Sequence, residues 1–171
     1  KKFKISNIIT EHIISLIDLL NDMGANLKVN NDSIDVFPSE KIKATKVKTA
    51  PYPGFPTDLQ AQIMALMSIA DGNSEIKETI FENRFMHVPE LNRLGANIKV
   101  KKETAFIEGN KKFKPAQVMA SDLRASVSLV LAGLCANGKT TINRVYHLDR
   151  GYEKIEKTLG KQGPIIIREK I

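Results

Sequence analysis

The feature that most constrains the fold is a ten-residue segment that occurs twice. Residues 20–29 read LNDMGANLKV and residues 91–100 read LNRLGANIKV. Each copy follows apolar residues with helical spacing, and each contains a glycine, Gly24 or Gly95, of the kind that ends a helix in the left-handed conformation. Alternating residues and a short polar turn come next. The repeat therefore predicts a unit of helix, strand, turn and strand that occurs more than once.

A weaker third copy, RGYEKIEKTLGKQGPIIIR, occupies residues 150–168. Gly163 takes the glycine position there, and residues 165–167 stand where the next strand is expected. Pro164 has no amide hydrogen to donate, which argues against normal strand pairing at this point. We therefore predict an α/β fold of pseudo-symmetric, repeated helix-and-sheet units, with two complete units and a partial third.

A second element is repeated between these copies. Residues 56–72 read PTDLQAQIMALMSIADG, residues 120–138 read ASDLRASVSLVLAGLCANG, and a strand-like segment follows each. Both segments are apolar around most of the helix, as expected for central helices wrapped by sheets. Thr57 and Ser121 are the predicted N-caps, and Gln60 is placed to complete a capping box with Thr57.

Composition limits the class of protein. The 171 residues, 42% of them hydrophobic, are enough for one core. Lys and Arg total 26 against 19 Asp and Glu, a net charge of +7, which favours anionic partners such as nucleic acid, phospho-compounds or an acidic membrane surface. The lysines lack interleaved aromatic residues, so we interpret them as a solvated basic surface and expect no nucleic-acid partner.

The sequence gives no support for secretion, membrane insertion or metal binding. It contains no run of about eighteen apolar residues and no leader pattern, so neither a membrane partner nor export is expected. Its single cysteine, Cys135, has no second thiol or histidine-rich spacing nearby to complete a disulfide or a metal site. We expect a buried, inert thiol.

Four ordered blocks resemble the enolpyruvyl transferases that act on UDP-N-acetylglucosamine. They are APYPGFPTDLQAQ, ETIFENRFMHVPELNRLGAN, AQVMASDLRASVSLVLAG and YHLDRGYEKIE, and they span residues 50–157. The sister enzymes that make 5-enolpyruvylshikimate 3-phosphate share the fold but would not carry FMHVPELNRLGAN. The resemblance implies an enzyme of two lobes, each an inverse α/β prism, with the active site between them. Residues 1–171 are then expected to form a single lobe, mainly the C-terminal one, with the second lobe absent from this chain.

The resemblance also implies a reaction. The enolpyruvyl group passes from phosphoenolpyruvate to the 3′-hydroxyl of UDP-N-acetylglucosamine by addition and elimination, in the first committed step of peptidoglycan synthesis, in the cytoplasm. This chemistry needs a base, an acid and cations, but no cofactor and no metal. One lobe alone is expected to be inactive, because the other supplies the loop acid and further phosphate-binding cations. A non-catalytic module that binds anions or nucleotide sugars is the alternative from another class.

Asp58 matches the family carboxylate that lies on the sugar 3′-hydroxyl, so the resemblance implies that it is the base. A structural role is the alternative, because a helix start stabilises a negative charge by ~0.3–1 kcal/mol. That stabilisation weakens Asp58 as a base until closure of the second lobe removes water from the carboxylate. Ile80 matches a position that touches the nucleotide sugar through its backbone. His87 and His147 also lie in matching blocks, where packing or capping is expected.

Three arginines, Arg84, Arg124 and Arg150, stand in the matching blocks ENR, DLR and DRG. By resemblance they hold phosphoenolpyruvate and the tetrahedral intermediate, for which the guanidinium fork is suited. Glu82 and Asp122 could orient these arginines through ion pairs, or could form ordinary surface pairs worth less than about 1 kcal/mol. We expect all three guanidinium groups and the predicted base to face a single rim.

Overall fold

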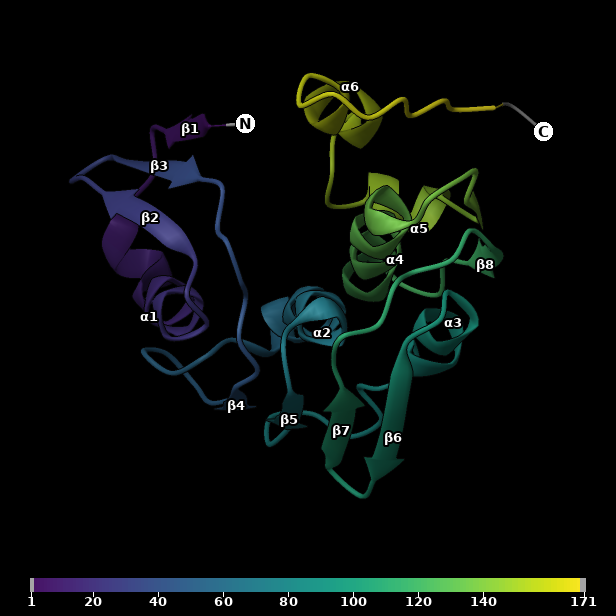
Figure 1. Ribbon diagram of the computed structural model, residues 1–171, viewed down its shortest axis with the longest axis horizontal. Coiled ribbons are helices and arrows are strands. Elements are labelled where there is room, and N and C mark those ends of the chain that lie inside the picture. Colours follow the sequence, from purple (N-terminus) through teal and green to yellow (C-terminus); the bar gives the residue numbers. More distant parts are fainter. Residues whose placement is uncertain (1, 170–171) are drawn as a thin grey trace.

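The computed structural model describes residues 2–169, in which three sheets surround a helical centre (Figure 1). The first sheet is antiparallel, in the order β1-β3-β2. The second has the order β4-β5-β7-β6, and the third pairs β8 with β9 in parallel. The strands are β1 Phe3–Ser6, β2 Asn26–Val29, β3 Ser33–Phe37, β4 Lys46–Lys48, β5 Asn73–Lys77, β6 Asn97–Lys101, β7 Thr104–Glu108, β8 Gln117–Met119 and β9 Thr141–Asn143.

The ten-residue repeat folds in both places as predicted. Helix α1 (Ile14–Asp22) is followed by β2 and β3, and helix α3 (Val88–Arg93) is followed by β6 and β7. Gly24 and Gly95 end these helices with φ angles of +86° and +101°. The amide after each glycine donates to a carbonyl five residues back, at 2.8 and 3.1 Å, which is the hydrogen bond of a Schellman motif. The same local chemistry therefore makes the same turn twice.

The third copy is partial, as the sequence predicts. Helix α6 (Ile155–Gly160) forms, and Gly163 has a φ of +122°. Residues 165–167 then run on without a strand partner within residues 2–169, in line with the missing amide of Pro164.

Two helices occupy the centre of the molecule (Figure 1). Helix α2 (Gln60–Ile69) connects β4 to β5, helix α4 (Leu123–Cys135) connects β8 to β9, and the two pack against each other. Met64 and Met67 of α2 are fully buried in the main core. Each such side chain stabilises the fold by about 1.5–3 kcal/mol through removal of apolar surface from water. The prediction of central helices wrapped by sheets is confirmed.

Three short helical elements complete the fold. The 3-10 helices η1 (Thr10–Ile13) and η2 (Thr57–Leu59) lead into α1 and α2. Helix α5 (Tyr146–Asp149) packs on α4, and its Leu148 lies in a small second core with Val127 and Val130. No helix within residues 2–169 is long and apolar enough to cross a bilayer.

The cap of α4 differs from the prediction. Its N-cap is Asp122, whose carboxylate accepts hydrogen bonds from the amides of Arg124 and Ala125 at 2.8 and 3.0 Å. Ser121, the predicted cap, is exposed one residue earlier. A carboxylate is the stronger acceptor at the positive end of a helix, which explains the preference.

The predicted capping box at the start of α2 is also wrong. The Thr57 hydroxyl donates to Glu78 Oε2 at 2.9 Å instead of accepting from a helix amide. Gln60 is 2% exposed, and its Nε2 has no hydrogen-bond partner within the described residues. The buried carboxylate of Glu78 offers Thr57 an acceptor that local sequence does not reveal.

Cys135 is exposed at the end of α4, not buried as predicted. Desolvation by the surrounding protein still raises the pKa of its thiol. The reactive thiolate is therefore scarce at neutral pH, which agrees with the predicted inertness.

Candidate functional site

Asp58 and two of the three predicted arginines meet at the start of the central helices. Arg124 donates to Asp58 from both Nε and Nη2, with a short contact to Oδ1 and a distance of 3.3 Å from Nη2 to Oδ2. Nη2 of Arg84 lies 3.8 Å from Asp58 Oδ1. The guanidinium carbon of Arg84 also lies 4.7 Å from the centre of the Phe81 ring, a cation–π arrangement. One carboxylate thus stands between two guanidinium groups.

Three segments place these side chains. Asp58 lies in η2 ahead of α2, and Arg124 lies in the first turn of α4. Arg84 lies in the turns between β5 and α3. Because α2 and α4 begin beside each other, the positive ends of two helix dipoles also converge here. Two cations against one carboxylate, together with these dipoles, make the rim attractive to anions.

The cluster is open to solvent. The side chain of Asp58 is 57% exposed, that of Arg124 37% and that of Arg84 23%. Exposed ion pairs of this kind contribute about 0–1 kcal/mol. An incoming anion can therefore take either guanidinium group from Asp58 at little cost.

Arg150 makes no ion pair within residues 2–169 and is exposed directly after α5. The adjacent backbone nevertheless passes close to the start of α4, because a side chain on Gly151 would lie 3.1 Å from Leu123 Cδ1. The backbone of this segment thus reaches the same end of α4 as Arg124, and the role of Arg150 in anion binding stays a prediction.

The contacts of Glu82 and Asp122 do not show the predicted supporting role, which stays a prediction. Both hydrogen bonds that cap α4 go to Asp122 Oδ1, and Glu82 is exposed. Within residues 2–169, neither carboxylate forms an ion pair with Arg84 or Arg124. The carboxylate that pairs with both guanidinium groups is Asp58, which the sequence assigned to proton abstraction and to contact with the sugar.

Glu78 is a residue that sequence reasoning missed. It follows β5 and is 2% exposed. Its Oε1 accepts from the Thr49 hydroxyl at 2.8 Å and from the amides of Ile80 and Phe81 at 2.8 and 3.2 Å. A ligand that contacts the backbone of Ile80 would therefore meet the carbonyl oxygen, since the amide is already bonded.

His87 is buried beside the site, at the start of α3, and its exposure is 2%. It makes no side-chain cap, so packing is the role that the structure gives it. Burial lowers the pKa of His87 from 6.5 to about 4, and the negative charge of Asp122 opposes this shift. His147 stacks on Tyr146, with ring centroids 4.3 Å apart.

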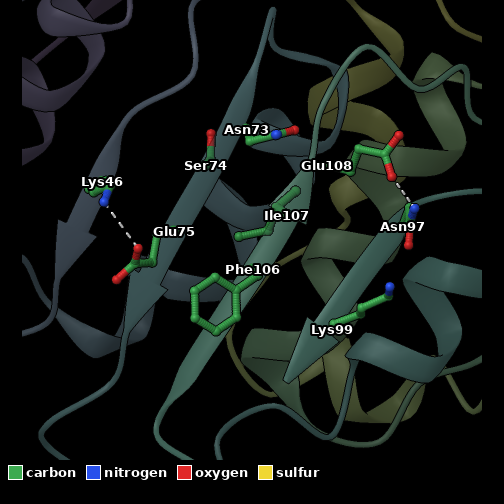
Figure 2. Close-up of a pocket in the computed structure, with 9 residues that line it drawn as sticks. All are labelled: Lys46, Asn73, Ser74, Glu75, Asn97, Lys99, Phe106, Ile107 and Glu108. Carbon is green, nitrogen blue, oxygen red and sulfur yellow. Dashed lines mark hydrogen bonds and ion pairs between the residues drawn. The ribbon is translucent and has the colours of Figure 1, made fainter. Parts of the chain in front are cut away.

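Two cavities lie away from this cluster. One, of about 420 Å³, is on the outer face of the second sheet, where Lys46 pairs with Glu75 at 3.3 Å beside Phe106 (Figure 2). The other, of about 570 Å³, lies between α4, β9 and residues 165–169. None of the predicted site residues lines either cavity. The described part of the chain also has no group of three or more His, Cys, Asp or Glu residues placed to hold a metal.

Comparisons with known proteins agree with this fold. The family model described as EPSP synthase (3-phosphoshikimate 1-carboxyvinyltransferase) matches residues 1–159. A protein of Pelagibacter ubique named UDP-N-acetylglucosamine 1-carboxyvinyltransferase is 56% identical over 165 residues, which is 96% of this chain and 40% of the relative. A protein of the same name from Lawsonia intracellularis is 60% identical over 154 residues, 90% of this chain and 37% of that relative. The chain therefore spans about two fifths of the length of these relatives.

Solved structures give the same result. The enolpyruvyl transferase NikO from Streptomyces tendae superposes with a TM-score of 0.88 at 29% identity, over 95% of this chain and 39% of that one. An EPSP synthase from Acinetobacter baumannii has a TM-score of 0.79 at 17% identity, over 99% of this chain and 43% of that one. At that identity the second match is informative about the fold alone.

Proposed function

The chain belongs to the EPSP synthase family of enolpyruvyl transferases, and on that premise we propose that it forms one lobe of an enzyme that transfers the enolpyruvyl group of phosphoenolpyruvate to the 3′-hydroxyl of UDP-N-acetylglucosamine. The acceptor is proposed from the names of relatives that are 56% and 60% identical to this chain. The observation that carries the proposal is the position of Asp58 between Arg84 and Arg124.

In the proposed reaction, Asp58 takes the proton of the sugar 3′-hydroxyl as the oxygen bonds to C2 of phosphoenolpyruvate. A proton is added at C3, by an acid that we assign to the second lobe. Loss of a proton from C3 and departure of phosphate then restore the double bond. Arg84 and Arg124 are proposed to hold the carboxylate and phosphate groups, because bidentate donors both orient these anions and stabilise their charge.

The Asp58–Arg124 pair is then the resting arrangement of the open lobe. Substrate anions must compete with Asp58 for the guanidinium group, and the exposed pair is weak enough for this exchange. Once Arg124 has moved to the substrate, Asp58 is released to accept a proton. Binding of the anionic donor and activation of the base are coupled in this proposal.

The further parts of the proposal follow the resemblance. Arg150 joins the other two arginines, and the reaction serves peptidoglycan synthesis in the cytoplasm. The isolated chain is proposed to be inactive, because the site comprises only the residues of one lobe.

The test is acceptor specificity in a two-lobed enzyme. Residues 1–171 replace the matching segment of the Pelagibacter ubique relative, and the unaltered relative, assayed in parallel, shows that the other lobe is competent. We expect phosphate release from phosphoenolpyruvate with UDP-N-acetylglucosamine and none with shikimate 3-phosphate. The opposite preference would overturn the proposed acceptor. Nucleotide-sugar binding without turnover, in a chimaera that folds, would favour the non-catalytic anion-binding alternative.

A further inference from the structure

Glu78 joins three segments of the chain through its buried carboxylate. Its Oε2 accepts from the Thr57 hydroxyl at 2.9 Å. Its Oε1 accepts from the Thr49 hydroxyl and from the amides of Ile80 and Phe81. The segments joined are the residue directly after β4, the start of η2 and the turn after β5. A fifth bond, from the Thr79 amide to Thr49 Oγ1 at 2.8 Å, closes the network.

A buried carboxylate carries a free-energy cost of desolvation, and the sheet does not need it to hold its strands together. Strands β4 and β5 already pair through their backbones. Removal of a carboxylate from water costs several kcal/mol unless its oxygens are fully bonded, and the side-chain partners of Glu78 are the neutral hydroxyls of Thr49 and Thr57. An apolar side chain, such as that of Ile76 two residues earlier, fills an inward position of β5 without that cost. What the carboxylate of Glu78 contributes is a fixed position for the hydroxyl and amide groups that donate to it.

The groups fixed by Glu78 are those that the proposed reaction needs. Thr57 immediately precedes Asp58, and the turn that starts with Ile80 leads to Arg84. We propose that Glu78 is a positioning residue, which sets the place of Asp58 relative to Ile80 and Arg84. This inference rests on the proposed function. It adds a residue that acts on the substrate only through its neighbours.

Glutamine at position 78 tests the hydrogen bonds of the carboxylate separately from its negative charge. In Glu78→Gln, the amide oxygen can take the place of Oε1 and keep three bonds. The amide nitrogen then faces the Thr57 hydroxyl, which can rotate and accept, because a hydroxyl both donates and accepts. Glu78→Ala instead leaves four donors without their acceptor. Thr57→Val removes a single bond with little change of shape.

The control removes a comparable hydroxyl that also links β5 to the chain beside β4. Ser74 Oγ accepts from the Thr45 amide at 3.2 Å and so also bridges β5 to the chain just before β4. Ser74 is 3% exposed and lies at the other end of β5 from Glu78. Ser74→Ala should therefore lower stability about as much as Thr57→Val without disturbing the rim.

The experiment measures kcat, KM and Tm for these four variants in the two-lobed chimaera. We expect Thr57→Val to lower kcat about tenfold or more and Glu78→Ala about 100-fold, since a shift of about 1 Å in a reacting group costs this much. Ser74→Ala should keep the parent kcat, and Glu78→Gln should recover most of the rate lost in Glu78→Ala.

Two results would overturn the inference. One is a kcat for Thr57→Val equal to that of Ser74→Ala. The other is a Glu78→Gln variant that is folded yet as slow as Glu78→Ala. If Glu78→Ala does not fold, the comparison of Thr57→Val with Ser74→Ala still decides. An inactive chimaera with unaltered residues would instead contradict the proposed function, so the two failures are distinguishable.

Discussion

Arg124 donates to both carboxylate oxygens of Asp58, which lies 66 residues earlier in the chain. The pair joins η2, which leads into α2, to the first turn of α4, and α2 and α4 pack against each other. It is exposed and weak, so it can open when an anion arrives. This contact ties the proposed base to the proposed anion-binding group.

The two residues occupy unlike places in the repeated motif. TDLQ at 57–60 aligns with SDLR at 121–124, so Asp58 corresponds to Asp122 and Gln60 to Arg124. Asp122 caps its own helix, whereas Asp58 bonds to the arginine of the other copy. The two pseudo-symmetric copies therefore differ in role: the carboxylate of Asp122 caps a helix, and that of Asp58 stays at the rim.

Arg124→Lys should raise the KM for phosphoenolpyruvate at least about tenfold in the two-lobed enzyme. A lysine ammonium cannot reproduce the bidentate contact of the guanidinium group, and each tenfold change corresponds to about 1.4 kcal/mol. Arg93→Lys is the matched control, since Arg93 is 62% exposed and, among the described residues, pairs only with Glu90 of its own helix. Equal KM values for the two variants would count against the assignment of Arg124.

The cap of α4 predicts that alanine substitutions at two neighbouring residues, Asp122 and Ser121, have different effects on stability. Asp122→Ala should lower the free energy of unfolding by about 0.5–2 kcal/mol, because two helix amides lose their acceptor. Ser121→Ala should change it by less than about 0.5 kcal/mol. Urea denaturation of the 171-residue chain measures both. A larger loss for Ser121→Ala would restore Ser121 as the cap.

The burial of His87 predicts that the free energy of unfolding decreases as the pH falls. Burial holds its pKa at about 4 in the folded protein, below the ordinary 6.5 expected after unfolding. The unfolded chain therefore binds the proton first as pH falls. The contribution of His87 is complete above pH ~6.5 and is lost progressively down to pH ~4, by up to about 3 kcal/mol.

His87→Gln should remove that part of the pH dependence of unfolding, whatever its effect on stability at pH 7. His12→Gln, at an exposed histidine, should retain it. Denaturant midpoints measured between pH 4 and 7 test this. Parallel curves for the parent and His87→Gln would show that His87 does not titrate as its burial requires.

The fold could be predicted because its signals are local. Gly24 and Gly95 mark the same helix end in both copies, and alternation marks the strands that follow. The caps differ from the prediction because the competing groups are the neighbouring carboxylate of Asp122 for Ser121 and a distant carboxylate for Thr57. Glu78, which takes the Thr57 hydroxyl, comes 21 residues later. The sequence does contain a sign that Glu78 is buried. It follows Ser74 and Ile76 in the alternation of inward-facing residues on β5, where a carboxylate is unusual.

The site was only partly predictable for the same reason. The blocks identified Asp58, Arg84 and Arg124, and the structure brings these three together. Their mutual contacts depend on how α2 packs against α4, which local sequence does not specify. Sequence proximity favours Glu82 and Asp122 as partners of the arginines, either as an orienting network or as ordinary surface pairs, and does not indicate Asp58.

The most direct test of the account is the turnover of Asp58→Asn in the two-lobed enzyme, measured as phosphate release with saturating phosphoenolpyruvate and UDP-N-acetylglucosamine. Asparagine keeps the shape of Asp58 but cannot accept the sugar proton, so kcat should fall by about 100-fold or more. The Tm should stay within about 2 °C of the parent value, because the lost ion pairs are exposed. A kcat near that of the parent enzyme would contradict the assignment of Asp58 as the base.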